Sequence, residues 1–132
     1  VWQEVLRNYG LDIDEKFYNS RISGRLNPLI IQDLLPHLSD LENQHLADCK
    51  EEKFRELASE LKPLPGLNQV LDWTEKCGLK RALVTNAPRK NVEFILSVLN
   101  LTETFAPVVL AEEAAAPKPD PAPYKLALNL LD

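Results

Sequence analysis

The chain has 132 residues, of which 45% are hydrophobic and 27% are charged, a balance typical of a globular protein with one domain or two small ones. Its formal net charge is -5 and its basic residues are scattered along the chain, so we expect no binding surface for nucleic acid or for an anionic membrane. No apolar run approaches the roughly 20 residues that are needed to cross a bilayer.

The two cysteines, Cys49 and Cys77, lie in helix-like segments and do not have the spacing of metal ligands. We therefore expect buried or half-buried thiols without a redox or metal role. The N-terminus begins in an amphipathic pattern rather than an apolar signal region. Together these features predict an intracellular, cytoplasmic protein.

Residues 1–62 show helical periodicity almost throughout and contain no convincing strand. Asn27 before Pro28 has the pattern of an N-cap followed by proline in the first helical turn. After the break at "PHLSD", Ser39 or Asp40 offers the next N-cap. This part of the chain is predicted to be a helical bundle.

Residues 40–61 are predicted to form one long helix that closes this bundle. Its apolar positions set the side that should face the core. We expect its buried side chains to be Leu46, Phe54, Leu57 and Leu61.

Residues 63–132 alternate between helix and strand. The predicted elements are a helix closed by Gly78, a strand at 81–85, a helix at 87–100, a strand at 107–111 and a helix from about Pro121. This order favours parallel strands joined by right-handed crossovers, as in part of a Rossmann-like α/β core. Two parallel strands make a poor sheet alone, so we expect further segments to pair with them.

Polar residues follow both predicted strands, at the ends where open α/β sheets bind ligands. Thr85 offers a hydroxyl, and the backbone N–H groups after it suit an oxyanion such as phosphate. Lys118, in the loop after the second strand, could neutralise charge on the same anion. These residues are the candidate site.

Simpler interpretations exist for each of these residues. Thr85 or Asn86 after a strand is often a helix N-cap, and Lys118 could be a solvated loop cation. Arg89 and Lys90 are expected to be solvated side chains of the first helical turn.

Four prolines surround Lys118 at alternate positions: Pro117, Pro119, Pro121 and Pro123. No two of them stand three apart, so a PxxP ligand for a partner domain is disfavoured. Proline fixes φ and removes N–H donors, which predicts an extended and stiff loop that holds the lysine in place. The last two prolines also suit the first turn of the final helix.

Two segments, "ALVTNAPRKN" and "PKPDPAPYKLAL", resemble the second and third motifs of haloacid dehalogenase-like hydrolases. The subgroup is that of phosphoglycolate phosphatase and β-phosphoglucomutase. The front half, "YGLDIDEKFYNSRISGRLNPLIIQDLL", is similar to the helical cap domain of that subgroup. The resemblance implies a helical cap domain at 1–62 and part of an α/β hydrolase core at 63–132.

The resemblance also implies roles for single residues. Thr85 matches the Ser or Thr whose hydroxyl binds the transferring phosphoryl group, and Lys118 matches the catalytic lysine that steadies that group and the nucleophile. Asn86 follows the motif and would contribute its backbone N–H to phosphate. Arg25, next to Gly24 in the cap loop, is a candidate for substrate contact.

Two acidic motifs of the family are missing from this pattern. Family members use an aspartate nucleophile in a DxD motif after an N-terminal strand, and a later acidic pair holds Mg²⁺. Asp12 and Asp14 form a DxD that follows a glycine turn, so Asp14 is expected to start a helix. Asp132 lies where the last helix ends and is not expected to bind metal. The ligands of Mg²⁺ are therefore expected outside this chain.

The resemblance predicts a portion of a Mg²⁺-dependent phosphatase that acts on a small phosphorylated substrate through an aspartyl-phosphate intermediate. The chain resembles the middle of such an enzyme, and we expect no turnover from it alone. The missing core segments of the same protein would then be its partners. Alternatives are a phosphomutase, a haloacid dehalogenase, a non-catalytic interaction module that docks through its sheet edges, or a fragment without a role of its own.

Overall fold

The computed structural model describes all 132 residues and divides into two compact units, Val1–Ala58 and Ser59–Asp132. Each unit has its own hydrophobic core. None of the helices has the length and apolar character that spanning a membrane would require.

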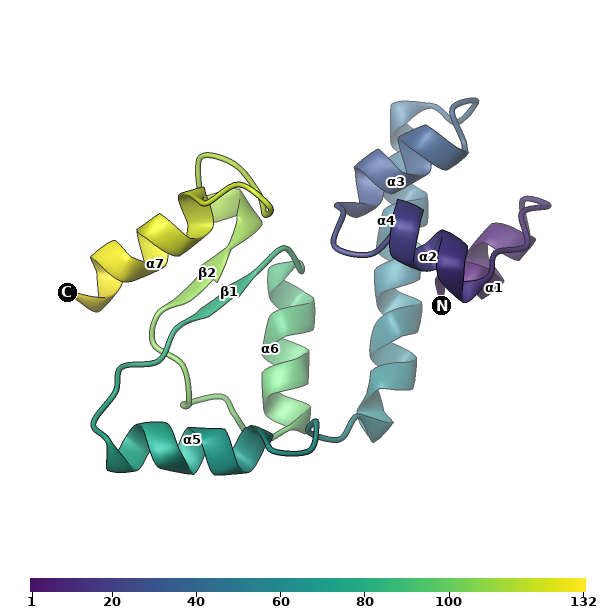
Figure 1. The fold of residues 1–132 in the computed structure, drawn as a ribbon. Coiled ribbons are helices and arrows are strands. Elements are labelled where there is room, and N and C mark those ends of the chain that lie inside the picture. Colours follow the sequence, from purple (N-terminus) through teal and green to yellow (C-terminus); the bar gives the residue numbers. More distant parts are fainter. The chain divides into compact units, whose positions relative to one another are not determined.

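The first unit is helical, as its periodicity predicts. Its helices are α1 (Trp2–Arg7), α2 (Glu15–Arg21), α3 (Asn27–Leu34) and α4 (Asp40–Leu57) (Figure 1). α3 packs along α4, and apolar side chains of all four helices and of their connections form the core. Its buried members are Trp2, Leu6, Ile13, Ile22, Ile30, Ile31, Leu35 and Ala47.

Ser39 is the N-cap of α4, so of the two alternatives predicted for this cap, Ser39 and Asp40, the first is confirmed. Its hydroxyl accepts the N–H of Glu42 at 3.3 Å, and the Glu42 carboxylate accepts the N–H of Ser39 at 2.8 Å. This reciprocal capping box satisfies two backbone donors. The prediction for α3 is wrong by one residue, because Leu26 is its N-cap and Asn27 is already helical.

α4 ends at Leu57 and is followed by a 3₁₀ turn at Ala58–Glu60, so the long helix stops earlier than predicted. Leu46 packs against the core, whereas Leu57 is 58% exposed and Leu61 is 41% exposed. The expected burial of Leu57 and Leu61 is therefore wrong.

The position of the buried face of α4 explains this difference. Ala47, Glu51 and Ala58 are buried, and their separations of four and seven residues place them on one helical face. Leu57 is rotated by about 100° from Ala58, and Cys49 lies on the side opposite to this face. Cys49 is accordingly a free and exposed thiol.

Cys77 is also free and exposed, so the expectation of buried thiols is wrong for both cysteines. It follows α5 (Leu67–Lys76) as the C-cap of that helix. Gly78 comes next with φ +64°, a left-handed conformation that glycine adopts without steric cost. The predicted closure of this helix by Gly78 is confirmed.

A charge pair lies inside the first unit. The ammonium of Lys50 is 2.9 Å from the carboxylate of Glu51, and the two side chains are 13% and 10% exposed. The same ammonium lies 5.5 Å from the ring centre of Trp2 and 5.7 Å from that of Phe54. The amide of Asn27 donates a hydrogen bond to Glu51. The pair thus joins α1, α3 and α4.

The second unit has the alternating order that the sequence predicts. After α5 come β1 (Leu83–Thr85), α6 (Arg89–Val98), β2 (Val108–Leu110) and α7 (Ala122–Leu131) (Figure 1). β1 and β2 are parallel neighbours, with Thr85 opposite Leu110 in the register. The prediction of an α/β fold with a small parallel sheet is confirmed.

Helices cover both faces of this strand pair. Side chains alternate between the faces of a strand, so Val109 points away from the face that holds Leu83 and Leu110. On the Leu110 face, α5 and α6 pack around Val92, Leu96, Leu101 and Leu110. α7 contacts both strands and lies on the other side of the pair from α6 (Figure 1).

We expect Ser39→Ala to lower the free energy of unfolding of the first unit by about 1 kcal/mol, because the hydroxyl no longer accepts the N–H of Glu42 or donates to the Glu42 carboxylate at 2.6 Å. The hydrogen bonds from Ser39 hold the pKa of Glu42 below its ordinary value of 4.5. A carboxyl group whose pKa is lower in the folded state than in the unfolded state stabilises the folded state at any pH above its unfolded-state pKa. This stabilisation is lost as the pH falls through the folded-state pKa. The difference in the free energy of unfolding between the parent chain and Ser39→Ala should therefore become smaller below pH 4.5.

Urea unfolding, followed by the fluorescence of Trp2 in a Trp73→Phe background, measures this difference in the first unit. Trp2 is 7% exposed and Trp73 is 58% exposed. Ser97→Ala, at an exposed position of α6, is the matched control and should be nearly neutral. An equal loss of stability in both variants would contradict the capping role.

Candidate functional site

The candidate site lies where both strands of the second unit end. Thr85 is the last residue of β1, and Lys118 belongs to the connection between β2 and α7. Because the strands are parallel and Thr85 pairs with Leu110, both connections leave the sheet at the same edge. The fold therefore brings Thr85, Asn86 and Lys118 together.

Thr85 closes a short turn with its own side chain. Its Oγ1 accepts the N–H of Ala87 at 3.0 Å, which leaves the hydroxyl hydrogen to donate elsewhere. α6 begins only at Arg89, and its N-cap Pro88 makes no side-chain cap. The alternative in which Thr85 or Asn86 caps this helix is therefore wrong.

Asn86 bridges the two connections through its side chain. Its Nδ2 donates to the backbone oxygen of Lys118 at 3.0 Å, and its Oδ1 accepts the backbone N–H of Lys118 at 3.0 Å. The sequence prediction considered only the backbone of Asn86 and missed this contact. One signal was present, because Pro117 and Pro119 have no N–H and leave Lys118 as the only backbone donor of the tripeptide.

Lys118 is half-buried and its ammonium is held in place. Nζ donates to the backbone oxygen of Val84 at 3.1 Å, which places the cation beside the end of β1. A half-buried and hydrogen-bonded ammonium is not the solvated loop cation of the simpler interpretation. Two further N–H donors of the ammonium can still bind an anion.

The proline-rich loop is a turn rather than the extended run that the prolines predicted. The peptide bond between Lys118 and Pro119 is cis, and the N–H of Asp120 donates to the oxygen of Pro117 at 3.0 Å. Proline fixes φ but leaves the preceding peptide bond a choice of cis or trans. Sequence spacing alone therefore could not define the path of this loop.

A second contact joins the same two connections. The guanidinium of Arg89 is 2.6 Å from the carboxylate of Glu113, which also accepts the N–H of Leu110 at 2.8 Å. Arg89 is thus paired rather than simply solvated. The side chains are 50% and 38% exposed, so the ion pair itself adds little stability.

The site offers a hydroxyl and an ammonium, which together suit a small anion such as phosphate. Divalent metal ions such as Mg²⁺ need several oxygen ligands, usually including carboxylates. Nowhere in the chain do three or more His, Cys, Asp or Glu side chains gather so that they could hold a metal ion. The residues present therefore do not fit a magnesium site.

Arg25, the fourth candidate, belongs to the first unit. Its guanidinium lies 2.9 Å from the carboxylate of Asp33, which Arg21 also contacts at 3.1 Å. Arg25 further donates to the backbone oxygen of Arg21 at 2.8 Å. These contacts give Arg25 a defined position beside the turn at Gly24.

The acidic pair in "GLDIDEK" has structural partners. Asp14 is the N-cap of α2 and accepts the N–H of Phe17 at 2.7 Å, which confirms its predicted place at a helix start. Asp12 pairs with Arg7 at 3.1 Å. Neither carboxylate belongs to the unit that contains Thr85 and Lys118.

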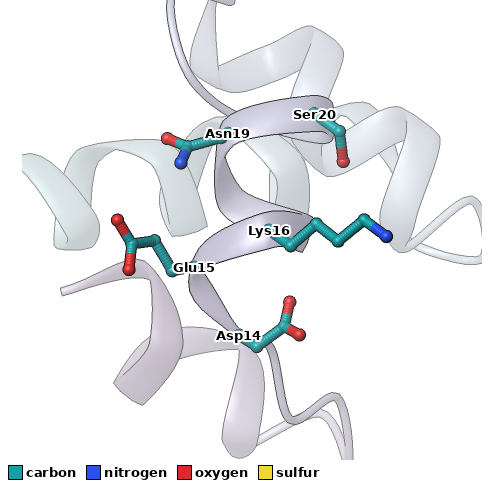
Figure 2. Close-up of a pocket in the computed structure, with 5 residues that line it drawn as sticks. All are labelled: Asp14, Glu15, Lys16, Asn19 and Ser20. Atoms are coloured by element: carbon teal, nitrogen blue, oxygen red, sulfur yellow. The ribbon is translucent and has the colours of Figure 1, made fainter.

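An open pocket of about 710 Å³ lies along α2, and Figure 2 shows the side chains that line it. They are Asp14, Glu15, Lys16, Asn19 and Ser20. None of the predicted site residues is among them. We assign no function to this pocket.

The sequence matches a family model described as haloacid dehalogenase-like hydrolase over residues 2–132. A phosphorylated carbohydrates phosphatase from Thermotoga maritima is 30% identical to the chain over 135 residues. The match covers 100% of this chain and 62% of that protein.

Solved structures share the fold. A β-phosphoglucomutase from Clostridium difficile has a TM-score of 0.86 at 23% identity, over 98% of this chain and 61% of that one. CbbY from Rhodobacter sphaeroides in complex with phosphate has a TM-score of 0.82 at 23% identity, over 99% of this chain and 63% of that one. The chain thus spans less than two thirds of each of these proteins.

Titration of Asp33 tests the cluster around Arg25. Hydrogen bonds from Arg25 and then from Arg21 hold the pKa of Asp33 below its ordinary value of 3.8. We expect Arg25→Ala to raise this pKa more than Arg21→Ala does, as measured by ¹³C NMR of the carboxyl group. The stabilising effect of the cluster should be present above pH 3.8 and decline as the pH falls through the folded pKa. An unchanged pKa in Arg25→Ala would rule out this ion pair in solution.

Proposed function

The chain belongs to the haloacid dehalogenase-like hydrolase family, and on that premise we propose that residues 1–132 are part of a magnesium-dependent phosphatase. The enzyme would act through an aspartyl-phosphate intermediate on a small phosphorylated substrate. Residues 1–62 would form its cap domain, and residues 63–132 would form part of its core. The cytoplasmic location of the protein stays a prediction.

One observation supports this proposal above the others. The hydroxyl of Thr85 and the ammonium of Lys118 lie at the same edge of the sheet, and Asn86 joins the two connections. A hydroxyl donor and a cation at the carboxyl ends of parallel strands form a site for a transferring phosphoryl group.

Each of these residues would have a defined task. The Thr85 hydroxyl donates a hydrogen bond to one phosphoryl oxygen, since its own oxygen already accepts the N–H of Ala87. Lys118 keeps one N–H on the oxygen of Val84 and turns the others to the phosphoryl group, whose negative charge it neutralises. The backbone N–H of Asn86 is proposed as a further donor.

The aspartate nucleophile and the ligands of Mg²⁺ are proposed to lie outside residues 1–132. When bound, the metal ion would neutralise charge on the phosphate oxygens. The residues of this chain do not form the site of that metal ion. Their contribution is to bind and orient the phosphoryl group.

The substrate is proposed to be a phosphorylated small molecule, with Arg25 as a contact from the cap. The relative at 30% identity is named a phosphorylated carbohydrates phosphatase. The likeness to a β-phosphoglucomutase is at 23% identity and shows the fold alone. A phosphatase is therefore preferred to a phosphomutase or a dehalogenase.

We expect the chain to bind inorganic phosphate through Lys118, as measured by NMR titration at constant ionic strength with chloride. Lys118→Ala should weaken binding about tenfold or more, because a charge-assisted hydrogen bond is lost. Lys125→Ala, at an exposed position of α7, is the matched control and should bind like the parent chain. Equal affinities in all three proteins would contradict the phosphoryl site and favour an interaction module.

With Mg²⁺ and p-nitrophenyl phosphate, the 132-residue chain alone should release no phosphate, because its site supplies donors and a cation but no aspartate nucleophile. A colorimetric phosphate assay measures this. Metal-dependent hydrolysis that disappears in Lys118→Ala would show that the chain is a complete catalyst and would overturn this part of the proposal.

A further inference from the structure

We propose that the side chain of Asn86 is a positioning residue that fixes Lys118 through the backbone of the lysine, and that it does not bind phosphate itself. The inference rests on the proposed function, because it explains how the cation of the phosphoryl site is held. The inference depends separately on the two hydrogen bonds between the Asn86 side chain and the backbone of Lys118.

The side-chain amide of Asn86 matches the backbone of Lys118 on both sides. Its Nδ2 meets the carbonyl oxygen and its Oδ1 meets the N–H, each at 3.0 Å. Only one orientation of the amide satisfies both bonds, because a reversed amide would set donor against donor and acceptor against acceptor. Both of these hydrogen bonds go to one residue, which lies 32 positions further along the chain.

These contacts matter because a lysine side chain is long and flexible. Ordering it costs up to about 2 kcal/mol of rotamer entropy. In this structure Asn86 holds its backbone, while the oxygen of Val84 holds its ammonium at 3.1 Å. With both ends held, the cation is in place before an anion arrives, which is preorganisation.

The flanking prolines leave few other anchors for this residue. Pro117 and Pro119 have no N–H, so the N–H of Lys118 is the only backbone donor among these three residues, and it goes to Asn86. Without the amide, this donor and the carbonyl of Lys118 lose their protein partner. The backbone at Lys118 would then be free to move relative to β1.

A double-mutant cycle separates positioning from direct contact. The affinity for inorganic phosphate is measured by NMR titration for the 132-residue chain, Asn86→Ala, Lys118→Ala and the double variant. Asn129→Ala, at an exposed position of α7, is the matched control. Hydrogen exchange of the Lys118 backbone amide is measured without phosphate in the parent chain, Asn86→Ala and Asn129→Ala, which all retain Lys118.

Asn86→Ala should weaken phosphate binding about threefold to tenfold, as expected for lost hydrogen bonds. In the Lys118→Ala background the same change should have no further effect, because there is no ammonium left to position. The Lys118 amide should exchange faster in Asn86→Ala, while the amides of β1 and α6 keep their protection. Asn129→Ala should change none of these values.

Other outcomes overturn the proposal. If the two substitutions weaken binding additively, Asn86 acts independently of Lys118 and the positioning role fails. If Asn86→Ala leaves both the affinity and the exchange rate unchanged, the amide does not hold Lys118. If Lys118→Ala itself has no effect on affinity, the proposed function fails, but the exchange measurement still decides whether Asn86 holds the backbone.

Asn86→Ser keeps the experiment decisive if Asn86→Ala is poorly folded. The serine side chain is polar but too short to contact both backbone groups, so it should behave as alanine does in the cycle. Circular dichroism and the thermal midpoint show whether each variant is folded. A serine variant that is folded and that binds phosphate like the parent chain would refute the positioning role.

Discussion

The parallel pairing of β1 with β2 is the constraint on which the rest of the second unit depends. Both strands have only three residues, yet their register places Thr85 opposite Leu110 and sends the two following connections out at one edge. An antiparallel pair would have placed these connections at opposite ends. Every contact between them, from Asn86 to Lys118 and from Arg89 to Glu113, follows from this register.

The two connections are held together by several modest contacts rather than by one strong contact. A neutral hydrogen bond contributes about 1 kcal/mol, and an exposed ion pair contributes less. Asn86 contacts Lys118, and Arg89 contacts Glu113, so two separate contacts join the chain that follows β1 to the chain that follows β2. The hydrophobic faces under α6 and α7 supply stability, whereas these polar contacts supply geometry.

Local patterns were enough to predict much of the fold, and contacts between distant residues were not. The helix and strand order, the cap at Ser39 and the closure at Gly78 depend on neighbours in sequence, and the structure confirms them. The burial of Leu57 and the two cysteines was misjudged, because the buried face of a helix depends on what packs against it. At the candidate site, Thr85 and Lys118 could be named from the motifs. The flanking prolines mark the N–H of Lys118 as a donor that needs a partner, but they do not identify Asn86 as that partner, because the contact depends on the register of two strands.

The charge pair inside the first unit restricts which sequences this fold can accept. Lys50 and Glu51 are almost enclosed, with Asn27 on the carboxylate and two aromatic rings near the ammonium. Replacing one partner alone leaves a charge inside the protein without its counterion, which costs more than replacing both with apolar residues of similar volume. Among homologous chains, Lys50 and Glu51 should therefore either both be kept or both be replaced.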